Sequence, residues 1–172
     1  MHLHCATRTH PTVCFKTKSM DLVLWRHAIA VDADESIDDM QRPLTALGEA
    51  QAAEMAQWLN RHLPKSSIVL CSPALRTRQT MMHLGKKNYQ LCPEIAPGAS
   101  VEQLLHTANW PDSEQTVVVV GHQPTLGLTA QHLLGMQVPC AVKKGAVWWL
   151  RRREREGQAQ VVLMAVQNPR ML

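Results

Sequence analysis

The sequence predicts a three-layer α/β/α sandwich whose sheet is mainly parallel and ends in a C-terminal antiparallel hairpin. Between residues 20 and 135, short apolar runs alternate with segments of helical periodicity, which is the pattern of an α/β protein. Four consecutive valines at 117–120 show no polar alternation, as in a strand buried on both faces of a parallel sheet. Segments 145–153 and 159–167 are rich in β-forming residues and are separated by a turn sequence, which indicates the hairpin.

The first part of this pattern predicts a strand, a loop and a long helix. Residues 21–25 form a short apolar run typical of a buried strand, whereas the acidic stretch 31–41 has no periodicity and predicts a loop. Thr45 is the expected N-cap of a helix that continues to about Leu63, because Pro64 cannot extend it. We expect the apolar stripe of this helix to consist of Leu47, Met55, Trp58 and Leu59.

The elements that follow alternate between strands and helices. Ser100 is the expected cap of one helix, and Pro124 is expected in the first turn of another. We expect strands within 66–73, 89–95 and 116–122, and helices within 74–85, 100–108 and 124–135.

Charged and imidazole side chains follow three of the expected strands. Arg26 and His27 come directly after the first strand, and His122 follows the valine run. Arg76 lies in the first turn of the helix after the second strand. Ligands of open α/β sheets bind outside the carboxyl ends of the strands, so we expect these four side chains in one pocket. Two arginines and two histidines repel each other unless an anion is bound, and phosphoryl oxygens accept forked guanidinium hydrogen bonds.

Each of these residues also has a simpler interpretation when taken alone. Arg26 would be a surface residue and His27 a hydrogen-bonded core histidine. Arg76 would be a solvated helix residue, and His122 would mark a change of chain direction. Their shared position at strand ends favours the phosphoryl pocket over four independent explanations.

Four stretches in the same order carry a resemblance to a known family: "LWRHA", "RPLTALGEAQA", "CSPALRTRQT" and "VVVVGHQP". Together they span residues 21–135, and the chain resembles the histidine phosphatase superfamily with its phosphoglycerate-mutase-like fold. The short length, RHA in place of RHG, and the RPLT motif make it most similar to the SixA-type phosphohistidine phosphatases.

The resemblance implies a role for each of the four site residues. His27 is the nucleophile that forms a phosphohistidine intermediate, Arg26 and Arg76 bind the phosphoryl oxygens, and His122 is a further donor. The neighbouring arginines favour neutral His27, and its second ring nitrogen is expected to donate to a backbone carbonyl. The implied enzyme is a phosphatase without cofactor or metal, acting on a phosphorylated protein (phosphohistidine) or on a small phosphorylated substrate.

Two further residues are candidates with open alternatives. Arg42, in the RPLT motif, contacts phosphate or substrate, or else pairs with nearby acids, and Thr45 is expected to cap a helix. Glu94 is a candidate general acid, although a surface role is the simpler interpretation and a phosphoramidate leaving group needs a strong acid less. The acidic stretch 31–41 either shapes the substrate site or is a solvated surface.

Composition restricts the class of protein. The chain has 172 residues, 45% hydrophobic and 19% charged, which suits one globular domain. Residues 1–19 contain three basic residues and no acid, so they account for most of the formal charge of +4 and the charge does not indicate a nucleic-acid partner. We expect 1–19 to be an extension outside the fold and 20–172 to be a single domain. Five cysteines without a CxxC motif indicate neither a disulfide framework nor a zinc site.

The sequence also shows neither a signal-peptide pattern nor a membrane-length apolar run, so we expect a cytoplasmic protein without a membrane partner. Three other functions stay open. The protein could act on a small phosphorylated metabolite, could bind phosphate without turnover, or could be a metal-dependent hydrolase with His27 and His122 as ligands. A mutase is disfavoured, because the chain lacks room for long insertions around a sugar phosphate.

Overall fold

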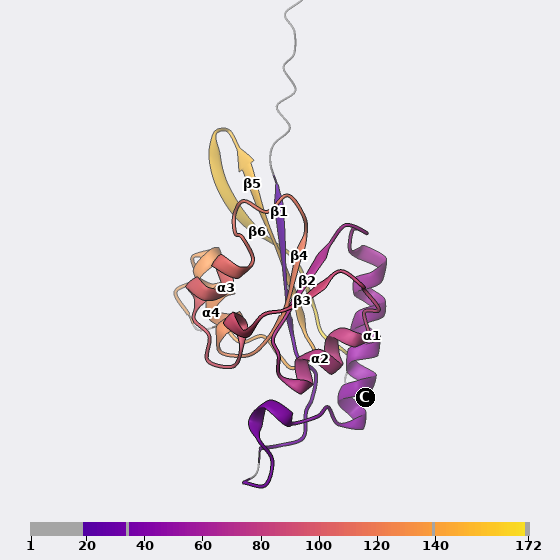
Figure 1. The fold of residues 1–172 in the computed structure, drawn as a ribbon. Helices are drawn as coiled ribbons and strands as arrows, with labels where there is room; N and C mark the ends of the chain where they lie inside the picture. Colours follow the sequence, from indigo (N-terminus) through magenta and orange to yellow (C-terminus); the bar gives the residue numbers. More distant parts are fainter. Residues whose placement is uncertain (1–18, 34, 139, 171–172) are drawn as a thin grey trace, which may run out of the picture.

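The computed structural model describes residues 19–33, 35–138 and 140–170. Its centre is a six-stranded sheet with the strand order β3-β2-β4-β1-β5-β6 (Figure 1). The strands are β1 (Met20–Arg26), β2 (Ile68–Cys71), β3 (Tyr89–Leu91), β4 (Val117–Gly121), β5 (Val147–Arg155) and β6 (Gln158–Gln167). The helices are α1 (Ala46–His62), α2 (Leu75–Met82), α3 (Val101–Thr107) and α4 (Thr125–Leu134), with short 3-10 turns η1 (Asp39–Gln41) and η2 (Pro93–Ile95).

The sheet has the mixed topology that the sequence predicts. β1, β4, β2 and β3 are parallel neighbours, whereas β5 runs antiparallel to β1 and pairs with β6 in a hairpin. All five residues of β4 are buried, in agreement with the interpretation of the valine run.

Helices cover both faces of this sheet and complete three layers. Figure 1 shows α1 and α2 on one side of the strands and α3 and α4 on the other. Each face has its own apolar core. Val23 and Trp25 of β1 point toward the α1 side, and Leu22 and Leu24 point toward the α4 side. The predicted three-layer sandwich is therefore confirmed.

The long helix α1 begins and ends where the sequence predicts. The Thr45 side chain accepts a hydrogen bond from the Gly48 backbone at 3.0 Å, and Leu63 is the C-terminal cap before Pro64. The expected stripe is wrong in one position, because Leu47 is exposed and Gly48 is buried in its place. A Cβ atom on Gly48 would stand 1.9 Å from the Ile29 carbonyl oxygen, so this glycine lets α1 approach the segment that follows β1.

The hairpin corrects one expectation. Alternation predicts that one of Trp148 and Trp149 is buried and the other exposed. Trp149 is buried in the α1-side core, but Trp148 is also partly buried and packs against the α4-side core. Both faces of β5 are covered at this point because each of the two cores reaches this part of the strand.

Two sequence expectations concern the N-terminal extension and membrane-spanning segments. The expected extension 1–19 lies outside the described residues except for Ser19, which is exposed and directly precedes β1. Within the described part, no helix has the length and apolar character needed to cross a membrane.

Candidate active site

The ends of three strands bring the sequence-predicted residues together. Arg26 is the last residue of β1 and lies opposite Gly121 of β4 in the parallel register, so His27 and His122 leave adjacent strands at the same edge. Their ring centroids are 5.4 Å apart. Arg76, in the first turn of α2, reaches the same place, with one guanidinium nitrogen 3.5 Å from His122 Nδ1. The site therefore combines Arg26 and His27 at the end of β1 with Arg76 of α2 and with His122, which follows β4.

His27 is held with one ring nitrogen committed to the backbone. The side chain is 6% exposed, and its Nδ1 lies 2.7 Å from the Ala28 carbonyl oxygen. The Ala28 backbone nitrogen in turn donates to Thr80 Oγ1 at 3.1 Å. A neutral ring with Nδ1–H as donor to Ala28 leaves a lone pair on Nε2. The expected backbone contact is thus present, and Nε2 is the ring nitrogen that keeps its lone pair.

Burial and positive neighbours keep His27 neutral. Its pKa is lowered to about 4, chiefly by burial and also by the charges of Arg76, Arg26 and Lys144, while the hydrogen bond with Ala28 opposes this shift. Burial also lowers the pKa of His122 to about 3, with His27 and Arg76 adding to the effect. Both imidazoles are therefore uncharged near neutral pH.

His122 is oriented by a residue that sequence reasoning missed. Its Nε2 lies 2.7 Å from the hydroxyl of Ser72, which is buried and directly follows β2. A serine hydroxyl both donates and accepts, so either tautomer of His122 is compatible with this contact. Ser72 stands at a strand end like the other site residues, and the same rule of strand ends could have selected it.

The two arginines of the site, of which Arg76 is buried and Arg26 half-buried, are incompletely satisfied. Arg26 donates from Nη1 to the Val142 carbonyl at 2.8 Å, and Arg76 is only 3% exposed. The Nε atom of each is buried and finds no hydrogen-bond partner among the described residues. Burying a charged donor without a partner is unfavourable, so the two Nε–H groups indicate a site built for an anion.

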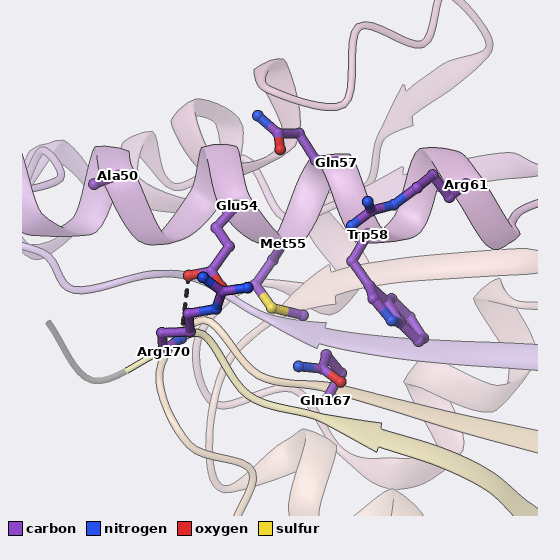
Figure 2. A pocket seen from close by; sticks show the side chains of 8 residues that line it. All are labelled: Ala50, Glu54, Met55, Gln57, Trp58, Arg61, Gln167 and Arg170. Carbon is purple, nitrogen blue, oxygen red and sulfur yellow. Dashed lines mark hydrogen bonds and ion pairs between the residues drawn. The ribbon is translucent and has the colours of Figure 1, made fainter.

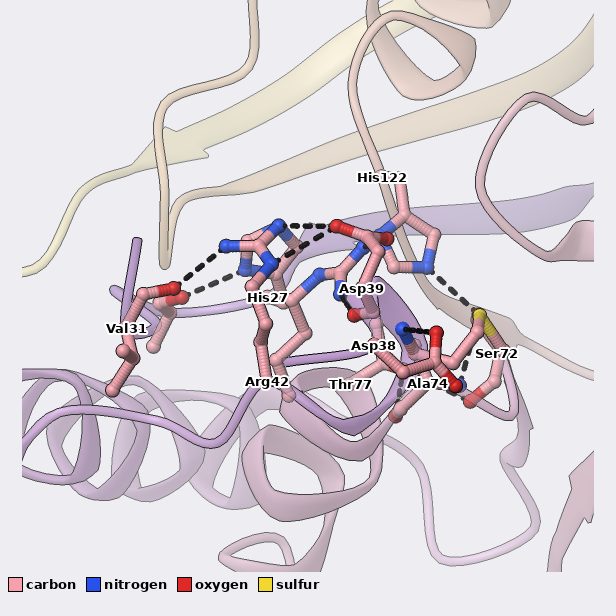
Figure 3. Close-up of polar contacts among 12 residues, drawn as sticks. His27, Val31, Asp38, Asp39, Arg42, Ser72, Ala74, Thr77 and His122 are labelled. Atoms are coloured by element: carbon pink, nitrogen blue, oxygen red, sulfur yellow. Dashed lines mark hydrogen bonds and ion pairs between the residues drawn. The ribbon is translucent and has the colours of Figure 1, made fainter. Parts of the chain in front are cut away.

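A carboxylate from the acidic stretch occupies part of this site. Asp39 Oδ2 lies 3.0 Å from Arg76 Nη2, and the Asp39 carbonyl accepts from Arg76 Nη1 at 2.5 Å. Arg42 contacts the same carboxylate at 2.8 Å and donates to the Val31 carbonyl at 2.7 Å (Figure 3). Burial would raise the pKa of Asp39, but hydrogen bonds from Arg42 and Arg76 lower it below its ordinary value. Asp39 is therefore a charged neighbour of Arg76, which the sequence did not single out by residue.

The structure separates Glu94 from these contacts. Glu94 lies on η2, is exposed, and makes no hydrogen bond or ion pair with a described residue. It lines a pocket of about 240 Å³ together with the segment 96–99 and Gln103. The site residues of β1, α2 and β4 do not line that pocket.

Other hollows lack this chemistry. A cavity of about 420 Å³ lies between α1 and the C-terminal end of β6, and Figure 2 shows Glu54 paired with Arg170 at its side. None of the site residues predicted from the sequence lines it. In the part of the chain that the structure describes, no group of three or more His, Cys, Asp or Glu side chains is placed to hold a metal ion.

Known proteins share both the sequence and the fold. The family model of the histidine phosphatase superfamily (branch 1) matches residues 22–98. A solved structure from Nakamurella multipartitia, provisionally named phosphohistidine phosphatase SixA, is 32% identical, with a TM-score of 0.71 over 88% of this chain and 96% of that chain. The chain belongs to the histidine phosphatase superfamily.

Two curated relatives extend the likeness within this superfamily. Phosphohistidine phosphatase SixA of Escherichia coli is 28% identical over 127 residues, which cover 70% of this chain and 78% of the relative. An uncharacterised protein of Mycobacterium tuberculosis is 36% identical over 109 residues, 61% of this chain. The chain spans 66% of the length of that mycobacterial relative.

Proposed function

We propose that this protein hydrolyses a phosphoryl group through a covalent phosphohistidine intermediate on His27, and that its substrate is phosphohistidine in a protein. The observation that carries the proposal is the pair of arginines with buried, unpartnered Nε–H groups beside a neutral imidazole. An anion with several oxygens satisfies these donors, and a phosphoryl group is such an anion.

The first step is attack by His27 Nε2 on phosphorus. Nδ1 stays bound to the Ala28 carbonyl, so the attacking lone pair keeps its direction. The new N–P bond forms on His27 as the P–N bond to the substrate imidazole breaks, and the leaving nitrogen takes a proton from water. Water then attacks the phosphorus of phosphorylated His27, which releases inorganic phosphate and restores the neutral imidazole.

The arginines and His122 stabilise the charge of the transferred group in this proposal. Arg26 and Arg76 donate to the phosphoryl oxygens. Once Arg76 Nη2 has left His122 Nδ1 for the phosphoryl group, Ser72 donates to Nε2 of His122 and its Nδ1–H donates to the phosphoryl group. Asp39 competes with the phosphoryl group for Arg76, so substrate binding displaces its carboxylate. Arg42 then remains as a further phosphate contact. Glu94 is not required, because an imidazole is a good leaving group once protonated.

The test is turnover of an aryl phosphate and of a phosphohistidine peptide in the presence of EDTA, by wild type and His27→Ala. We expect both substrates to be hydrolysed with EDTA present and the variant to be inactive. Faster hydrolysis of the peptide would indicate that the substrate is a phosphoprotein. Faster hydrolysis of the aryl phosphate or of small phosphorylated metabolites would indicate a small substrate. Loss of activity in EDTA would indicate a metal-dependent hydrolase. Phosphate binding without turnover would indicate a non-catalytic binding module.

A further inference from the structure

A segment after α4 is bound to the backbone and side chains of the active site. We define the lysine loop as residues 142–146. Arg26 donates to the Val142 carbonyl, the Gly145 backbone nitrogen donates to the His27 carbonyl at 3.0 Å, and Trp25 Nε1 donates to the Gly145 carbonyl at 3.0 Å. These contacts hold the loop directly beside the proposed nucleophile.

The conformation of the loop turns its two lysines outward. The Ala146 backbone nitrogen donates to the Lys143 carbonyl at 3.0 Å, and Gly145 has a φ of +78°, which closes a tight turn. Val142, Gly145 and Ala146 are buried, whereas Lys143 and Lys144 are exposed. Neither lysine side chain makes an ion pair or a hydrogen bond with a described residue. The turn therefore presents two adjacent free ammonium groups.

The turn that carries these ammonium groups is bonded to the backbone of His27 through the Gly145 nitrogen. The charge of Lys144 also contributes to lowering the pKa of His27. The other loop beside the site has the opposite charge, since Glu35 and Asp38 are exposed and Asp39 contacts Arg76. The two loops thus give the surroundings of the pocket a basic part and an acidic part.

We propose that Lys143 and Lys144 bind carboxylates of the substrate protein on one side of its phosphohistidine. This inference rests on the proposed function and names the class of protein segment that the site prefers. Flexible ammonium groups without a surrounding pocket suit mobile carboxylates, whereas a second tightly bound phosphate calls for forked guanidinium donors. Acids on the other side of the phosphohistidine meet Glu35 and Asp38 and are disfavoured by like charge.

The experiment compares three phosphohistidine peptides of equal length. One has two glutamates on the N-terminal side of the phosphohistidine, one has them on the C-terminal side, and one has glutamines in both places. Wild type is compared with Lys143→Ser/Lys144→Ser and with Lys143→Arg/Lys144→Arg. The matched control is Arg153→Ser/Arg155→Ser, which removes the same charge from the hairpin. Thermal melting establishes that each variant is folded.

We expect wild type to prefer one glutamate peptide over the glutamine peptide by about fivefold in kcat/KM, the size expected for two exposed ion pairs. Lys143→Ser/Lys144→Ser should lose this preference, whereas Lys143→Arg/Lys144→Arg and the hairpin control should keep it. The preference also declines with added salt. Equal rates on all three peptides, or an equal loss in the hairpin control, would overturn the proposal.

Binding separates this inference from the proposed function. The affinity of each phosphohistidine peptide is measured in the His27→Ala background, with and without Lys143→Ser/Lys144→Ser. If wild type hydrolyses no peptide and no aryl phosphate, the proposed function fails, and a lysine-dependent preference in binding still supports the lysine loop. If the peptides bind without preference, the lysine proposal fails whether or not the enzyme turns over.

Discussion

Arginines occur at both ends of the sheet, and their surroundings differ completely. Arg26 and Arg76 lie at the carboxyl ends of the parallel strands, where the Arg76 side chain is 4% exposed. At the other end, Met20 of β1 pairs with Arg152, and the hairpin continues beyond it to Arg155, whose side chain is 67% exposed. Residue type is the same, but the desolvation of the charge is not.

This difference in burial distinguishes arginines that bind a ligand from arginines that only make the surface polar. A guanidinium group in water loses little and needs no partner, whereas a buried one must be matched by an anion or by acceptors. Arg26 and Arg76 keep unpartnered buried Nε atoms in the described structure. A buried guanidinium nitrogen that lacks a hydrogen-bond partner therefore indicates a ligand, whereas exposed arginines on a surface strand do not.

The largest effect is expected for the buried arginine of α2. Replacing Arg76 with Ala should lower kcat/KM for an aryl phosphate by about a thousandfold, because a charge-assisted donor to the transition state is lost. The same substitution at Arg153 should leave kcat/KM within a factor of about two. Melting curves distinguish lost chemistry from lost folding. Equal effects at the two positions would remove the distinction between the two ends of the sheet.

The acid limit of activity is the next largest effect. His27 must be neutral to attack, and burial lowers its pKa from 6.5 to about 4. We expect kcat/KM to fall below about pH 4 rather than below pH 6.5, with a slope of about tenfold per pH unit. A pH profile with a substrate of constant charge checks this, and an acid limb near 6.5 would contradict the neutral buried state.

The same histidine links pH to stability. The unfolded chain protonates His27 near its ordinary pKa of 6.5, whereas the folded chain does so only near 4. The unfolded state therefore binds more protons between these values, so the free energy of unfolding is highest above 6.5 and decreases as pH falls toward 4. We expect His27→Asn, which cannot be protonated, to reduce the decrease in Tm over this range. A decrease of the same size in the variant would assign it to other groups.

A smaller change is expected from the carboxylate beside Arg76. Asp39 contacts both Arg76 and Arg42 and competes with phosphate in the proposed mechanism. Asp39→Asn should tighten inhibition by inorganic phosphate by up to about fivefold, since one exposed ion pair is worth up to about 1 kcal/mol. Asp38→Asn is the matched control, because its carboxylate instead accepts from the Met40 backbone. Weaker phosphate inhibition in Asp39→Asn would mean that Asp39 orients the arginines for substrate.

Stability effects at the hairpin should be smaller still. Arg151 makes two contacts with Asp21, at 2.6 and 2.7 Å, and Asp21 is mostly buried. Arg151→Ala should lower the free energy of unfolding by about 1 kcal/mol, and Arg153→Ala should lower it by less than about 0.5 kcal/mol. Urea unfolding of both variants measures the two values. A larger loss of unfolding free energy for Arg153→Ala than for Arg151→Ala would show that the exposure of these arginines does not determine their contribution to stability.

Features set by short-range chemistry were predictable from the sequence. Thr45 and Ser100 cap their helices as expected, because a cap depends on side chains within about one turn of the backbone they serve. The strand ends that supply Arg26, His27 and His122 were also predictable, since apolar runs end where the chain leaves the sheet. The direction of the His27 backbone contact follows from its immediate neighbour Ala28.

Features that depend on distant segments were not predictable. Asp39 and Arg76 are 37 residues apart, and Ser72 and His122 are 50 residues apart, so no local pattern connects them. The partial burial of Trp148 likewise depends on the core that packs on its face of the sheet rather than on alternation within β5.

The sequence by itself determined the layered α/β architecture and the set of cations and imidazoles delivered to one sheet edge. Periodicity, helix caps and strand ends are determined by neighbouring residues. Parallel neighbouring strands place their carboxyl ends at the same edge of the sheet. Only the tertiary structure decided how those groups are satisfied: which guanidinium nitrogens stay unpartnered, that Asp39 rather than Glu94 reaches the site, and that the lysine loop lies beside His27. These depend on how loops far apart in the chain pack, and packing is set by the whole fold.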